Sequence, residues 1–195
     1  MQFDGLKIGF ALTGSHCTLH EVIKVIKRLV DEGADITTIV SYSVDTMDTR
    51  FGKAEDWKQQ LREITNKDLI YTIPGAEPVG PQKMFDCVVI APCSGNTMAK
   101  LANGITDTPV LMAAKSHLRN QKPLVLAIST NDGLGLNARN LGTLLITKNI
   151  YLVPFGQDNP EVKVNSLMAH MDKVPETILM ACAGKQIQPV LKDHR

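Results

Sequence analysis

Short, mostly apolar segments alternate with longer amphipathic segments along this chain, and that alternation restricts its fold more than any other feature. Each apolar segment has the character of a strand buried on both faces; these segments cover residues 7–12, 36–40, 87–91, 124–128 and 151–153. The amphipathic segments predict helices at residues 18–32, 51–64, 96–103, 113–119, 138–147 and 166–183. Parallel strands joined by helices cross over in the right-handed sense and place helices on both faces of the sheet. The sequence therefore predicts a three-layer α/β fold with a doubly wound parallel sheet.

The length of the chain and two irregular segments define its expected organisation. With 195 residues it is long enough to bury a substantial core, and we expect one domain over residues 1–195. Residues 74–84 contain three prolines and predict a long ordered loop. The tail after about residue 185 is expected to be loosely ordered.

The charge balance and hydropathy exclude several classes of partner. Lysine and arginine (21 residues) nearly balance aspartate and glutamate (20 residues), so no overall field favours nucleic acid or an anionic membrane. No apolar segment reaches membrane-spanning length, and the first residues do not form a signal peptide. We therefore expect a cytoplasmic protein that binds neither nucleic acid nor a membrane.

Cysteine and histidine residues give no sign of a metal centre. The four cysteines form no CxxC pair, and the five histidines have no metal-ligand spacing. We expect free thiols and no metal site. His117 and His170 fall in predicted helices and are expected to be solvated.

The turn Thr13-Gly14-Ser15 follows the first predicted strand and precedes the first predicted helix. Gly14 would let an anion approach the backbone, the two hydroxyls could add hydrogen bonds, and the helix N-terminus favours negative charge. These features favour a phosphate site, although the segment is neither a Walker A motif nor GxGxxG, and a plain strand-to-helix bend explains it equally well. His16, next to this turn, is a candidate proton-transfer residue or a capping residue.

Two further polar loops follow predicted strands and should meet the same sheet edge. Ser41, Ser43 and Thr46 are either ligand contacts or part of the cap of the next helix, with Asp48 or Thr49 as its N-cap. In the other loop, Asn96 and Thr97 could hydrogen-bond a heterocycle or a carboxylate, and a well-capped helix is the alternative interpretation.

A dinucleotide-binding pattern occurs at Gly133-x-Gly135-x-x-Ala138, after the fourth predicted strand. The usual fingerprint follows the first strand, and an acidic residue follows it on the next strand. Here the acidic candidate, Asp158, is expected in a loop beyond the short last strand. The pattern is therefore a weak indication of NAD(P) binding.

Two motifs around the third predicted strand resemble a known family. Pro92-Cys93-Ser94-Gly95-Asn96-Thr97 is similar to its "PASANT" loop, and residues 100–107 are similar to "KIANGI.D". This is the flavoprotein family, which includes the flavin-dependent cysteine decarboxylases and the flavin prenyltransferases. The resemblance implies a flavodoxin-like or Rossmann-like fold, a homo-oligomer and bound FMN, with cofactor contacts from Thr13, Gly14, Ser15, Ser41, Ser43, Ser94, Asn96, Thr97, Thr130 and Asn131.

The chain departs from the decarboxylases at two motifs. Residues 77–82 match a "DPVxHI" segment but carry Pro81 in place of its histidine, and Ser129-Thr130-Asn131 replaces "PAMN". These departures argue against decarboxylation of a cysteinyl substrate.

Other segments resemble one branch of the family, the B subunits of bacterial dipicolinate synthases. They are "GFALTGSHCT", "GAEPVGP", "STNDGLGLN" and "VPFGQDNP". The resemblance implies a role in making dipicolinic acid from a dihydropyridine dicarboxylate, in the mother cell of a sporulating bacterium. It also implies a separate A subunit that carries NAD(P).

On this interpretation the catalytic residues are His16 and Asn96. The substrate carboxylates would be bound by cations chosen from Arg50, Lys100, Lys115 and Arg119, and at least half of these four are expected to be solvated surface charges instead. The alternative is a non-catalytic scaffold that kept the fold, lost its flavin and stabilises the A subunit.

Overall fold

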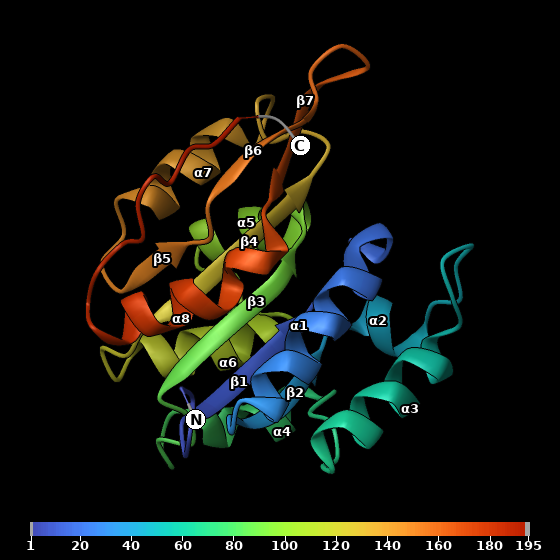
Figure 1. Ribbon diagram of the computed structural model, residues 1–195, viewed down its shortest axis with the longest axis vertical. Coiled ribbons are helices and arrows are strands. Elements are labelled where there is room, and N and C mark those ends of the chain that lie inside the picture. Colours follow the sequence, from blue (N-terminus) through green and yellow to red (C-terminus); the bar gives the residue numbers. More distant parts are fainter. Residues whose placement is uncertain (1, 194–195) are drawn as a thin grey trace.

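The structure, a computed structural model, describes residues 2–193 and contains the predicted parallel sheet. Five parallel strands lie in the order β2-β1-β3-β4-β5, which is the flavodoxin order (Figure 1). Their bounds are β1 Lys7–Leu12, β2 Asp35–Val40, β3 Cys87–Cys93, β4 Leu124–Thr130 and β5 Ile150–Leu152. All seven residues of β3 are buried, as expected of a central strand covered on both faces.

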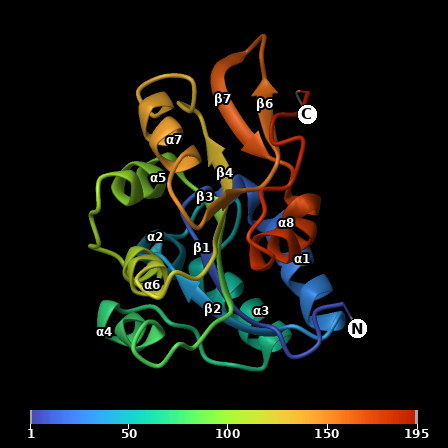
Figure 2. The ribbon, with the colours of Figure 1, turned by 90° about the vertical axis from the view of Figure 1, so that its left-hand side faces the viewer.

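Helices cover both faces of the sheet and confirm the three-layer prediction (Figure 2). One face carries α1 (Leu19–Asp31) and α8 (Val174–Cys182). The other carries α5 (Gly95–Ala102), α6 (Pro109–Leu118) and α7 (Ala138–Leu145). Beside β2 lie α2 (Tyr42–Thr46) and α3 (Ala54–Thr65), and α3 also packs against α1.

A β-hairpin at the end of the sheet corrects the sequence prediction. Strands β6 (Phe155–Asn159) and β7 (Lys163–Ala169) pair antiparallel, and β7 pairs antiparallel with the last residues of β4. The helix predicted over 166–183 is therefore wrong in its first part: α8 begins only at Val174, with Pro175 in its first turn. Asp158 lies in β6, not in the loop that we expected. The overlooked signals were the Asn159-Pro160 turn and the alternating valines after it.

The proline-rich segment also differs from the predicted loop. It begins as α4 (Ile73–Ala76) and continues as a 3₁₀ turn, Glu77–Val79. Pro74 and Pro78 each lie in the first turn of these short helices, where the missing N–H has no intrahelical partner to lose. Prolines here start helical turns instead of preventing them.

The C-terminal tail runs along the sheet. The side chain of Gln186 bonds the backbone of Leu152 in β5, and Phe155 of β6 bonds Val190 and Lys192 through its backbone. Over residues 2–193, no helix is both long and apolar enough to cross a membrane.

Two histidines differ from their predicted environments. His170 lies outside the helices, at the start of the 3₁₀ turn Met171–Lys173. His117 lies in α6 as predicted but is buried, with 1% of its surface exposed, and its Nε2 is 3.0 Å from the carbonyl oxygen of Pro123. Burial lowers the pKa of His117 from 6.5 to about 4, so the imidazole is neutral in the folded protein near pH 7.

This burial predicts that the free energy of unfolding falls as the pH is lowered from about 6.5 towards 4. The unfolded chain takes up a proton on His117 in this range while the folded protein does not, so the stability present above the unfolded pKa is lost as pH falls. Chemical unfolding at several pH values should show a loss of up to roughly 3 kcal/mol from this residue. The side-chain amide of His117→Gln can still donate to Pro123 but does not titrate. The free energy of unfolding of this variant should therefore fall less between pH 6.5 and 4, and the difference should equal the contribution of His117. An identical slope in the two proteins would contradict the assignment.

Candidate functional site

A cavity of about 490 Å³ opens at the carboxyl edge of the sheet. Its lining residues come from the loop after β1, the end of β4 and the turn after it, the start of α5, the loop between α2 and α3, and the β6–β7 hairpin. It is lined by Gly14, Ser15, His16, Cys17, Thr49, Arg50, Phe51, Gly95, Ser129, Thr130, Asn131, Asp158, Lys163, Ser166 and Met168. The strand order reverses between β1 and β3, and ligands of doubly wound sheets bind beyond the strand ends at such a point.

The loop after β1 is tied to the neighbouring loops by two hydroxyl groups. The Thr13 hydroxyl donates to the carbonyl oxygen of Pro92 (2.6 Å) and accepts from the Ser94 N–H (2.9 Å). The Ser15 hydroxyl donates to the carbonyl oxygen of Ser129 (2.6 Å). Since both hydroxyl protons are used inside the protein, the donors that remain for an anion are the backbone N–H groups at the start of the helical run that leads into α1.

Gly14 lies at the exposed tip of this loop, close to Ser43. A Cβ atom at Gly14 would lie 2.7 Å from the Ser43 hydroxyl, so a larger residue requires the Ser43 side chain or one of the two loops to shift. Ser43 in turn is 3.0 Å from the hydroxyl of Ser41. The structure therefore brings the first and second polar loops together as predicted, but neither Ser41 nor Ser43 lines the cavity.

The polar residues after β3 serve the start of α5. The Ser94 hydroxyl accepts from the Thr97 N–H and lies 3.1 Å from the Thr97 hydroxyl, which is the helix-capping arrangement. Asn96 is exposed. Only Gly95 of this loop lines the cavity. Capping was one of the two interpretations of this loop, and for Ser94 and Thr97 it is the one that the geometry shows.

The turn after β4 is held by a carboxylate. Asp132 accepts from the Thr130 hydroxyl (2.5 Å) and from the Asn137 amide (2.9 and 2.8 Å). This leaves Thr130 and Asn131 on the cavity wall, as the family resemblance implied. Gly133, the first glycine of the dinucleotide-like pattern, has a packing reason: its Cβ would lie 2.7 Å from the side chain of Leu167 in β7.

His16 is the predicted proton-transfer residue, and its ring lines the cavity. Its Nδ1 atom is buried and has no hydrogen-bond partner among residues 2–193. Burial lowers the pKa of His16, so the neutral, proton-accepting form is favoured near pH 7.

The four predicted substrate-binding cations do not converge on one site. Arg50 lines the cavity, with its guanidinium carbon 4.8 Å from the centre of the Phe51 ring. Lys100 forms an ion pair with Asp107 (2.7 Å). Lys115 and Arg119 line a separate cavity of about 360 Å³ beside α6. Only Arg50 of these four therefore reaches the main cavity.

Several cavity residues were not identified from the sequence. Lys163, Ser166 and Met168 come from β7, in or beside the segment that was predicted as helix. Recognising the hairpin turn at Asn159-Pro160 would have found them. Nowhere in residues 2–193 do three or more His, Cys, Asp or Glu side chains gather in a way that could hold a metal ion.

Comparison with known proteins gives consistent matches over the chain. The Flavoprotein family model matches residues 2–182. The B subunit of dipicolinate synthase from Bacillus subtilis (strain 168) is 50% identical over 190 residues, which are 97% of this chain and 95% of the relative.

Solved structures match as well. The crystal structure of the dipicolinate synthase B subunit from Bacillus halodurans C matches with a TM-score of 0.92 and 52% identity, over 100% of both chains. Burkholderia xenovorans DmrB in complex with FMN, described as a cubic protein cage for redox transfer, matches with a TM-score of 0.63 and 22% identity. That alignment covers 76% of this chain and 87% of DmrB, and at this identity it shows only the shared fold.

The bonds of Thr13 predict a specific cost for removing its hydroxyl. Thr13→Val keeps the shape of the side chain but leaves the buried Pro92 carbonyl and the Ser94 N–H without this partner. We expect a loss of about 1–3 kcal/mol in the free energy of unfolding, measured by urea denaturation. Thr13→Ser, which keeps the hydroxyl, should lose much less. A Val variant as stable as the unchanged protein would show that the bridge between the loops contributes nothing.

Proposed function

This chain belongs to the flavoprotein family, and we propose that it binds FMN in the main cavity and acts as the B subunit of a dipicolinate synthase. The observation that carries the proposal is the position of the cavity, where Gly14 and Ser15 after β1 face Thr130 and Asn131 after β4. The likeness to the two Bacillus proteins, at 50% and 52% identity over almost the whole chain, supports the choice of reaction.

The residues of the cavity fit a flavin mononucleotide. A volume of about 490 Å³ is in the range of small-molecule sites. The Gly14 turn, at the start of the helical run into α1, suits a phosphate group. Phe51 and Met168 offer apolar surface for a flat ring, and Asn131 and Thr130 offer polar groups for its edge. Of the ten residues proposed as cofactor contacts, the single chain presents Gly14, Ser15, Thr130 and Asn131 to the cavity.

The proposed reaction removes one hydride equivalent and one proton from a dihydropyridine dicarboxylate, which becomes aromatic. Bound FMN would supply the acceptor for the two electrons. His16 is suited to accept the proton because it lines the cavity and is kept neutral by burial. Arg50 would bind a carboxylate of the substrate.

The remaining elements of the proposal concern assembly. We propose a homo-oligomer, since Asn96 is exposed and does not line the cavity of one chain, which suits contact with a site completed by a neighbouring copy. The partner would be an A subunit that carries NAD(P). The setting would be the cytoplasm of the mother cell during sporulation.

The first test is an absorption spectrum of the purified protein in the near-ultraviolet and blue, before and after addition of FMN and desalting. A retained flavin band is expected. A colourless protein that still raises the activity of its NAD(P)-binding partner would overturn the flavin proposal in favour of the scaffold alternative.

The Gly14 turn predicts a charge-dependent loss of FMN. Gly14→Asp places a carboxylate beside the proposed phosphate position, and we expect FMN affinity to fall by about tenfold or more beyond the loss in Gly14→Asn. The asparagine variant has nearly the same size, so it carries the steric conflict with Ser43 without the charge. Circular dichroism confirms folding of both variants, and titration with FMN measures affinity. Equal affinities of the two variants would place the phosphate elsewhere.

A further inference from the structure

We propose that Lys163 and Arg50 form a two-point clamp for the carboxylates of the substrate, and that Asp158 occupies Lys163 until the substrate replaces it. This inference rests on the proposed dicarboxylate substrate, but its test does not require that flavin be bound. It assigns a specificity role to the β6–β7 hairpin.

The charges that line the cavity are few. Of its lining residues, Arg50, Asp158 and Lys163 carry full charges near pH 7, and together they leave one net positive charge. A dicarboxylate carries two negative charges. The second carboxylate therefore has a cationic partner among these residues only if Lys163 binds it in addition to Arg50.

The ion pair on the hairpin is suited to such an exchange. Lys163 Nζ lies 2.8 Å from Asp158 Oδ2, and the side chain of Lys163 is 53% exposed. The lysine head is accessible and has three N–H donors, so a ligand carboxylate can compete with Asp158 for it. The Asp158 side chain is only 20% exposed, and in the cavity wall its charge would repel an anionic ligand if Lys163 did not neutralise it.

Arg50 supplies the second point from a different segment. It lies in the loop between α2 and α3, stacked on Phe51, and takes part in no salt bridge among residues 2–193. Its planar guanidinium can bind a carboxylate with two parallel hydrogen bonds. A substrate carboxylate can therefore bind Arg50 without first breaking an ion pair within the described part of the chain.

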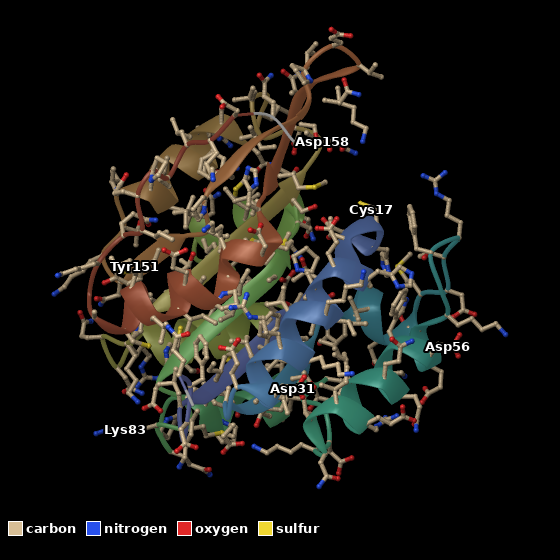
Figure 3. The ribbon with its side chains drawn as sticks, viewed as in Figure 1. Cys17, Asp31, Asp56, Lys83, Tyr151 and Asp158 are labelled. Carbon is tan, nitrogen blue, oxygen red and sulfur yellow. The ribbon has the colours of Figure 1, made fainter. Side chains whose placement is uncertain are left out.

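Lys163 and Arg50 lie in separate segments of the chain that line the same cavity. Figure 3 shows Asp158 on the hairpin, above Cys17 at the start of the α1 region, and both residues line the cavity. Lys163 lines the same cavity, so the hairpin and this end of the α1 region form parts of its wall. A flat ring with a carboxylate on each side could therefore be bound by the hairpin on one side and by the Arg50 loop on the other.

The test measures binding of two probes, pyridine-2,6-dicarboxylate and pyridine-2-carboxylate, by calorimetry with the full-length protein. Lys163→Gln should weaken binding of the dicarboxylate by about tenfold and of the monocarboxylate much less. Asp158→Asn should tighten binding of the dicarboxylate several-fold, because it frees the lysine. The double variant should bind the dicarboxylate more tightly than Lys163→Gln, because it lacks the unpaired Asp158 carboxylate, and more weakly than Asp158→Asn, because it lacks the lysine.

Three results would overturn the clamp: an unchanged affinity in Lys163→Gln, weaker binding in Asp158→Asn, or equal losses for the two probes. A further titration compares FMN with riboflavin. If Lys163→Gln weakens FMN but not riboflavin, Lys163 binds the cofactor phosphate and the inference is wrong. If the protein binds neither flavin yet shows the predicted order of dicarboxylate affinities, the flavin proposal fails and the clamp stands.

Discussion

Burial of the central strands on both faces is the constraint from which the rest of this structure follows. All seven residues of β3 are buried, and so are the last five of β1. Strands of this kind cannot carry polar side chains without leaving them unpaired in an apolar layer. The polar groups of the candidate site therefore lie at the ends of the parallel strands, in the loops beyond them and on the β6–β7 hairpin, and these parts meet around one cavity.

The same constraint explains why so many hydroxyl groups at that edge bond the protein itself. Loops that cross the end of a buried sheet expose backbone groups that need partners. Thr13 satisfies groups of Pro92 and Ser94, and Ser15 satisfies Ser129. These bonds hold three loops in fixed relative positions, which leaves the Gly14 backbone, His16 and the hairpin as the groups free to meet a ligand.

Structural elements that depend on short-range sequence patterns could be predicted from the sequence, whereas elements that depend on contacts between distant segments could not. The five parallel strands and most helices follow from hydrophobic periodicity, and the predictions for them are confirmed. The hairpin was missed because residues 166–169 are apolar enough for either a strand or a helix, and pairing with β4 decides between them.

The candidate site shows the same division. That Gly14, Ser15 and Thr130 come together follows from strand order, and the structure places all three on one cavity. Whether a serine caps a helix or faces a ligand depends on distances across the fold, which is why Ser94 could not be assigned from the sequence. Local sequence patterns likewise could not predict that Arg50 lines the main cavity while Lys115 lines a different one.

The divided pairing of β4 has a consequence for how this fold can diversify. Its first residues pair with β5 and its last two with β7, so the five parallel strands are complete before the hairpin begins. The base of the hairpin extends the sheet and packs into the core through Phe155, Leu167 and Ala169, while residues 161–165 near its tip are exposed. The length of the hairpin and the charge of the residues near its tip can change without disturbing the core. Each such change alters the lining of the cavity directly. Substitutions in this short segment can therefore change which ligand is bound with little effect on the free energy of unfolding.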